Sequence, residues 1–135
     1  VLNVDWVGDQ IVHRAVLLDV DTAVAASANG TAYQQGASAA AESIRGVRRV
    51  LAAPGGSGNN TLDVKIQSDN SGGFSSGTDR LTFTQLTQAS SASFEVQTAA
   101  GAVTDDYWRV VYTYGGAGSR SFSLVISFGI FKTSA

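Results

Sequence analysis

The sequence predicts an all-β fold, an antiparallel β-sandwich of roughly eight strands with a jelly roll as the leading topology. Three observations lead to this class. Many short stretches alternate apolar and polar residues, clusters of Gly, Ser, Asn and Asp separate them, and no stretch carries the apolar stripe of a helix. Alternation does not establish strand order, so a discoidin-like or immunoglobulin-like sandwich is the alternative topology.

The clearest alternation lies in residues 107–131, which read YWRVVYTYGGAGSRSFSLVISFGIF. Every second residue from Phe122 to Ile130 is apolar, and a looser series of the same kind begins at Trp108. Glycines between the two arms supply the positive φ angles that tight turns need. We therefore predict a long antiparallel hairpin with one apolar face, which a second sheet must cover.

Residues 1–11 (VLNVDWVGDQI) contain several apolar residues without clean alternation. Two interpretations remain open. The segment is either an edge strand lying over the core or an arm that docks on a neighbouring subunit. Residues 12–135 are predicted to form a single sandwich domain, because a chain of 135 residues has the length of one domain.

The first part of this domain contains one clear strand, residues 12–20 (VHRAVLLDV). Its predicted apolar face consists of Val12, Val16, Leu18 and Val20. His13 is the only histidine of the chain, and we expect it to be a surface or structural residue. Residues 21–43 are small and polar, which indicates loops or irregular edges rather than a helix.

Residues 44–53 (IRGVRRVLAA) are predicted to form a strand that carries Arg45, Arg48 and Arg49. Two interpretations of these arginines remain open. They form either a solvated strand face that discourages aggregation between sheets or a basic patch that meets an acidic partner surface. The glycine-rich loop that follows, residues 54–60, lacks the GKS or GKT sequence of a phosphate-binding loop.

Residues 61–68 (TLDVKIQS) alternate cleanly and predict another strand. The Gly/Ser-rich loop 69–79 comes next, and Phe74 is its one aromatic residue. This side chain is either tucked into the end of the sandwich or exposed for a partner.

Two further strands are predicted at residues 80–87 and 93–98, the second alternating around Phe94 and Val96. The linker between them is short. We therefore predict that these two strands pair with each other.

The composition argues against several classes of protein. A net charge of −2 at pH 7 argues against general nucleic-acid binding. The absence of cysteine excludes a disulfide framework and thiolate chemistry. No apolar run is long enough to cross a membrane and the start does not resemble a signal peptide, so no membrane partner is expected.

The sequence predicts no catalytic, cofactor or metal site, and therefore no enzyme. Serines are many, but no G-x-S-x-G motif sits between a strand and a helix, where a nucleophilic serine needs it. The acidic and amide residues Asp69, Asn70 and Asp79 do not follow the spacing of a calcium loop. Asp105 and Asp106 are adjacent, and adjacent strand residues point to opposite faces, so they do not form a two-carboxylate site.

The second half of the chain, residues 60–131, carries a recognisable series of motifs. They are IQSDN at Ile66–Asn70, FTQ at Phe83–Gln85, YWRVVYTYG at Tyr107–Gly115, and alternating Phe and small residues at Phe122–Phe128. This series resembles small proteins encoded among the structural genes of tailed bacteriophages. Those proteins in turn resemble jelly-roll cement or decoration proteins, which are auxiliary capsid proteins.

The resemblance implies a structural virion protein that lies on the outer surface of a phage capsid, where it bridges and stabilises capsomers. The implied partners are the major capsid protein and further copies of the chain, as a dimer or trimer. Neither nucleic acid, membrane nor cofactor is expected. Candidate partner-binding residues lie in the first eleven residues, the arginine strand and the Gly/Ser loop. They are Leu2, Val4, Trp6, Arg45, Arg48, Arg49 and Phe74.

An alternative function is a tail or fibre β-sandwich that binds host-surface carbohydrate. Such a protein needs a shallow aromatic site, and the candidates are Trp108, Tyr112 and Tyr114. Against this alternative, Trp108 and Tyr112 belong to the face that the alternation assigns to the core.

Overall fold

The fold is that of a computed structural model, which describes residues 12–132; for Val12–Arg14 it describes the backbone alone. Within this range the chain forms strands, turns and loops without a helix, and therefore without one that is long and apolar enough to span a membrane. The strands are β1 (Val12–Val24), β2 (Ala28–Asn29), β3 (Tyr33–Gln34), β4 (Glu42–Val50), β5 (Thr61–Asp69), β6 (Thr78–Thr82), β7 (Ser93–Ala100), β8 (Tyr107–Gly115) and β9 (Phe122–Lys132).

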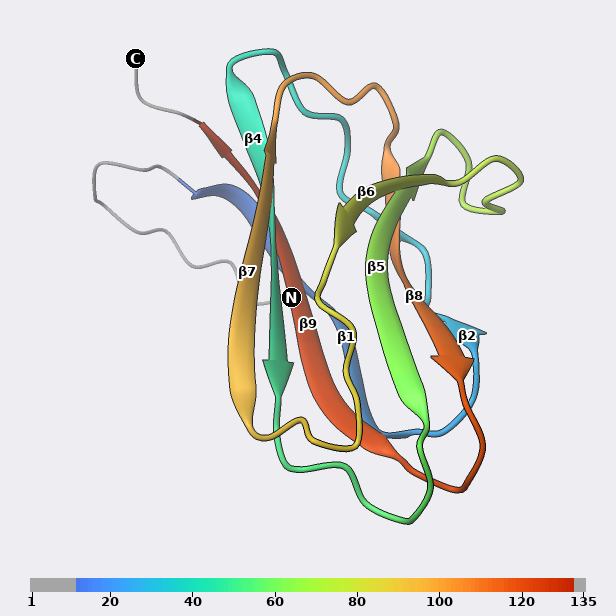
Figure 1. The fold of residues 1–135 in the computed structure, drawn as a ribbon. Helices are drawn as coiled ribbons and strands as arrows, with labels where there is room; N and C mark the ends of the chain where they lie inside the picture. Colours follow the sequence, from blue (N-terminus) through green and yellow to red (C-terminus); the bar gives the residue numbers. More distant parts are fainter. Residues whose placement is uncertain (1–11, 133–135) are drawn as a thin grey trace.

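The strands form two antiparallel sheets that pack face to face (Figure 1). Sheet A has the order β1-β9-β4-β7, and sheet B has the order β2-β8-β5-β6 with β3 also paired to β8. After β4 the chain passes to sheet B for β5 and β6, then alternates through β7, β8 and β9. This is the strand order of a jelly roll in which β2 and β3 share one position, so the predicted fold class is confirmed.

The core lies between the sheets and consists of the inward residues of both. Trp108 of β8 and Phe128 of β9 stack with ring centroids 4.4 Å apart, and Tyr114 meets Phe122 edge-on at 6.4 Å. Gly46 of β4 allows close packing, because an added Cβ there would lie 2.7 Å from Ile66 Cδ1 on sheet B. The predicted apolar faces of residues 61–68 and 122–130 are both buried in this core.

The predicted hairpin at 107–131 is wrong. Its two arms, β8 and β9, belong to different sheets and face each other across the core. Alternation establishes which residues of a strand are buried, but not whether the next strand lies beside it or opposite it. The connecting loop is instead held by loop 54–60, through bridges between Gly55 and Ser121 and between Gly58 and Gly118.

Two other sequence predictions are also wrong. Residues 80–87 and 93–98 do not pair, because β6 pairs with β5 in sheet B and β7 pairs with β4 in sheet A. In β1, the register shifts between Leu17 and Asp19, as at a β-bulge. The shift leaves Leu18 in the core but turns Val20, which had been assigned to the same face, outward.

Candidate functional site

The outer face of sheet A carries an apolar surface, which we call the A-face. It spans all four strands and the residue after β4. Its members are Leu17, Val20, Val47, Arg49, Leu51, Phe94, Val96 and Val125. Phe94 is 75% exposed and Leu17 is 58% exposed, unusually large values for side chains that are normally buried.

The strand register makes the A-face continuous. One row across the sheet runs from Leu17 through Ser127 and Val47 to Val96. A neighbouring row runs from Val20 through Val125 and Arg49 to Phe94. Side chains in such cross-strand rows lie about 5 Å apart, so these residues form one surface rather than scattered positions.

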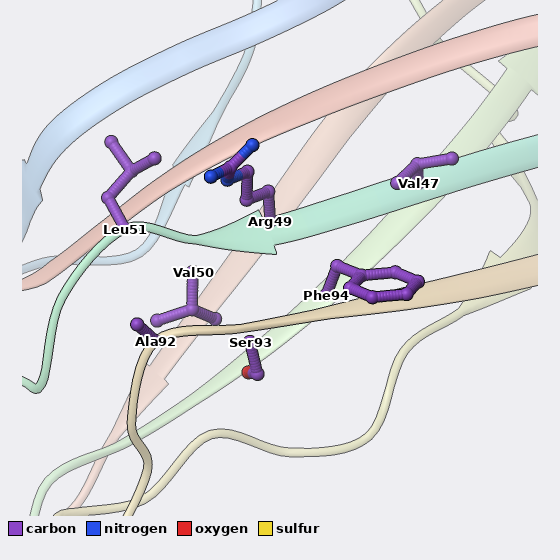
Figure 2. A pocket seen from close by; sticks show the side chains of 7 residues that line it. All are labelled: Val47, Arg49, Val50, Leu51, Ala92, Ser93 and Phe94. Atoms are coloured by element: carbon purple, nitrogen blue, oxygen red, sulfur yellow. The ribbon is translucent and has the colours of Figure 1, made fainter.

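A groove lies at one end of the A-face, where β4 and β7 run side by side (Figure 2). Its volume is about 490 Å³. It is lined by Val47, Arg49, Val50, Leu51, Ala92, Ser93 and Phe94. The lining is apolar apart from Arg49 and Ser93, so the groove suits an apolar side chain better than a charged ligand.

The three candidate arginines do not lie on one surface. Arg49 is exposed and Arg45 is half-buried, with its guanidinium 4.8 Å from the centre of the Phe131 ring. Arg48 points inward and is only 4% exposed. A basic patch made of all three arginines, one of the two interpretations left open by the sequence, is therefore ruled out, because the alternation of a strand sends Arg48 to the opposite face from its neighbour Arg49.

Arg48 forms a part-buried ion pair that belongs to the architecture. Its Nη2 lies 2.8 Å from Glu95 Oε2 on β7, and Nη1 donates to the backbone oxygen of Thr84. Burial lowers the pKa of Arg48 and the charge of Glu95 opposes this shift. Burial alone would raise the pKa of Glu95, but bonds from Thr84 and Gln97 together with the Arg48 charge hold it below its usual value.

Phe74 takes the buried one of its two predicted positions, with 8% of its surface exposed. The Arg109 guanidinium lies 4.2 Å from its ring centre. Asp69 holds the surrounding loop by accepting hydrogen bonds from the N–H groups of Ser71 and Ser76 at 2.9 and 2.8 Å. Phe74 is thus a packing residue and not an exposed partner contact.

Two further ion pairs join charged side chains of the described residues, Arg80–Asp105 and Lys65–Asp79. Asp105 accepts hydrogen bonds from Ser68 at 2.6 Å and from Arg80 at 3.0 Å, and these lower the pKa of its carboxyl group. Lys65 and Asp79 pair at 2.5 Å on sheet B. Within residues 12–132 no three His, Cys, Asp or Glu side chains come together as a metal site.

The aromatic residues proposed for carbohydrate binding are structural. Trp108 is fully buried, and its indole N–H donates to Gly36 O at 3.0 Å. Tyr112 is buried and donates to Asp19 at 3.0 Å, while burial and that carboxylate raise the pKa of its hydroxyl group. Tyr114 packs against the core and donates to Arg120 O at 2.7 Å. A shallow sugar site made by these three residues is therefore absent.

The other candidate residues, Leu2, Val4 and Trp6, lie outside the described residues. The sequence reasoning also missed the main feature of the surface. Phe94 and Val96 alternate with Glu95 and Gln97, a pattern that predicts an apolar face toward the core, yet this face of β7 points to solvent. Arg48 of β4 indicates the true orientation of β7. Its charge points inward and needs a partner, and Glu95 supplies it from the inward side of β7, so Phe94 and Val96 must point outward.

Comparison with known proteins supports no assignment to a family. No family model and no curated protein sequence matches this chain. Similar solved structures include disulfide-linked pili that form Bacillus endospore appendages (15% identity, 98% of this chain and 100% of that chain, TM-score 0.41). Desmodium yellow mottle tymovirus is another (11% identity, 99% and 94%, TM-score 0.44).

The N-terminal modules CBM22-1 and GH10 of Clostridium thermocellum xylanase 10B are also similar in part (10% identity, 90% of this chain and 26% of that chain, TM-score 0.43). These neighbours come from unrelated functional groups. With identities of at most 15% and TM-scores below 0.5, they assign this chain to none of those groups.

Proposed function

We propose that the protein is a capsid cement or decoration protein of a tailed bacteriophage. It binds the outer surface of the head and bridges capsomers. The observation that carries this proposal is the A-face, a continuous apolar surface on the outside of a jelly roll. Exposed apolar patches of this kind are typical of surfaces that bind other proteins.

The sequence motifs of residues 60–131 support a phage capsid as the partner. Their resemblance to phage structural proteins favours the major capsid protein and further copies of this chain over unrelated partners. The paired-strand architecture also suits a cement, because backbone ladders through both sheets resist deformation when a shell is strained. Many copies on one lattice act together, so each single contact can be weak.

The test is co-sedimentation of the purified protein with phage heads that lack it. We expect binding that saturates at a fixed ratio to the major capsid protein, because a lattice offers a fixed number of equivalent sites. The ratio, measured from gel bands, identifies the symmetry position. A folded protein that does not sediment with heads contradicts the proposal and favours the tail or fibre alternative.

Truncation of residues 1–7 is a second test. We expect head binding to be lost while the sandwich stays folded, because residues 12–132 build both of the described sheets. Circular dichroism and thermal unfolding check the fold. Unchanged head binding after this truncation contradicts a role for the arm.

A further inference from the structure

We propose that the groove between β4 and β7 receives Trp6 from the N-terminal arm of a second copy of this chain. The groove is concave and its lining is apolar apart from Arg49 and Ser93, and Phe94 in that lining is 75% exposed. β7 is the last strand of sheet A, so a neighbouring chain can enter the groove from an open edge. Trp is the side chain most favoured as an anchor in such pockets.

Charge complementarity supports this occupant. The first eleven residues contain Asp5 and Asp9 but no Lys, Arg or His. The groove contains Arg49 and no carboxylate. Because Asp5 is adjacent to Trp6, a seated indole brings this carboxylate to the rim, where it can pair with Arg49. A second A-face would instead bring another Arg49 against the first, which is repulsive.

The length of the arm shows why a second copy is needed. Val12 pairs with Phe131, whereas the groove lies beside the row of Val125 and Arg49. Six residues along β9 separate these rows, which is about 20 Å, and two strand spacings add about 10 Å sideways. The straight distance from Val12 to the groove is therefore about 22 Å.

Trp6 precedes Val12 by six residues. Six residues span at most about 21 Å even when they are fully extended. Moreover, β1 runs from Val12 toward the groove rows, so the preceding arm must reverse direction before it can follow the same path. A turn uses about four residues with little net advance, which leaves the chain's own Trp6 far short of its own groove.

The contact joins two different surfaces, the arm of one copy and the groove of another. Two copies can exchange arms reciprocally in a two-fold dimer, or each copy can pass its arm to the next around a closed ring such as a trimer. The proposal does not depend on binding to a capsid, because both contacting parts belong to this chain. Its test therefore uses the purified protein without heads, and its failure leaves the cement proposal unaffected.

The first experiment is sedimentation velocity of the full chain. We expect an oligomer for the wild type, and loss of that species for Trp6→Ala and for Phe94→Ser. Leu17→Ser is the matched control, because it also removes an exposed apolar side chain from the A-face but lies two strands from β4. A wild-type protein that is monomeric at all concentrations overturns the proposal, as does an oligomer that both variants leave intact.

The second experiment uses the absence of native cysteine. Separate Asp5→Cys and Arg49→Cys proteins are mixed under mild oxidation, and a disulfide-linked dimer of the two is expected on a non-reducing gel. Asp5→Cys mixed with Ser75→Cys is the control, because Ser75 lies in an exposed loop away from the groove. Equal cross-linking in the control overturns the proposal. So does a cross-linked monomer from one chain that carries both Asp5→Cys and Arg49→Cys.

Discussion

The outer faces of the two sheets differ in the side chains that they expose: polar side chains bonded to one another on sheet B, and unpaired apolar side chains on sheet A. On sheet B, outward side chains bond to one another: Lys65 pairs with Asp79 at 2.5 Å, and Arg109 donates to Gln67 at 3.0 Å. On sheet A, the corresponding rows carry exposed Leu17, Val20, Phe94 and Val96. Both faces belong to the same jelly roll, yet only sheet A leaves large apolar side chains exposed on its outer face. On the function proposed above, sheet A is the face that meets another protein.

The largest expected effect comes from the pair that lies beneath the A-face. Glu95→Gln leaves the buried charge of Arg48 without its partner. We expect the free energy of unfolding to fall by about 3 kcal/mol, measured by urea denaturation. A loss as small as that of an exposed ion pair would show that this pair does not hold β4 and β7 together.

The same pair predicts a dependence on pH. The folded-state pKa of Glu95 is lowered, so its contribution is fully present above the unfolded pKa of about 4.3 and is lost as the pH falls below that value. We therefore expect the wild type to lose stability more steeply than Glu95→Gln in acid. Parallel stability curves for the two proteins below that pH would contradict this assignment.

The pairing of Arg48 and Glu95 also shows what could be predicted from the sequence. Strand positions and the buried residues of β5, β8 and β9 follow from alternation, because a strand presents successive residues to opposite sides. Strand partners do not follow from it, and this is why the hairpin of residues 107–131 was wrongly predicted. Chain order alone cannot distinguish a neighbour within a sheet from a strand across the core.

The candidate site was harder to predict for a related reason. Phe94 and Val96 have the composition of a core face, and only the position of Arg48 shows that this face points outward. Phe74 in a polar loop was equally consistent with burial or exposure. In the structure its ring packs against Arg109, which lies far along the chain and could not be paired with it from the sequence.

A second expected effect concerns the contact between the sheets. Gly46→Ala places a methyl group 2.7 Å from Ile66 Cδ1 and 2.9 Å from Leu81 Cδ1, inside the core. We expect a loss of about 2 kcal/mol in the free energy of unfolding, because the buried side chains of Ile66 and Leu81 must shift within a packed core to admit the methyl group. Gly73→Ala is the control, since its nearest neighbour would be Ser71 Oγ at 3.7 Å. Equal effects of the two substitutions would contradict close packing at Gly46.

A third and smaller effect on the free energy of unfolding is expected on the outer face of sheet B. Asp79→Asn on sheet B removes the exposed ion pair with Lys65. We expect a loss of about 0.5 kcal/mol that shrinks as salt is added, because exposed charges are screened. Thermal unfolding at low and high ionic strength measures it. An effect independent of salt would show that Asp79 acts through packing or hydrogen bonds instead.

The smallest effect on stability is expected on the A-face itself. Phe94→Ser should change the free energy of unfolding by less than about 0.5 kcal/mol, because the ring is already in water in the folded protein. Urea denaturation of the dilute protein measures this. A loss of several kcal/mol would mean that Phe94 stabilises the fold of the single chain. It would contradict the interpretation of the A-face as a binding surface.

The most direct test of the contrast between the two faces is co-sedimentation with heads that lack the protein, using one charged substitution on each face. Leu17→Asp with Val20→Asp adds charge to the A-face, and Thr113→Asp adds charge to an exposed position on β8 of sheet B. We predict that the first variant loses saturable binding while the second binds like the wild type. Equal binding by both folded variants would contradict the claim that the A-face is the contact surface.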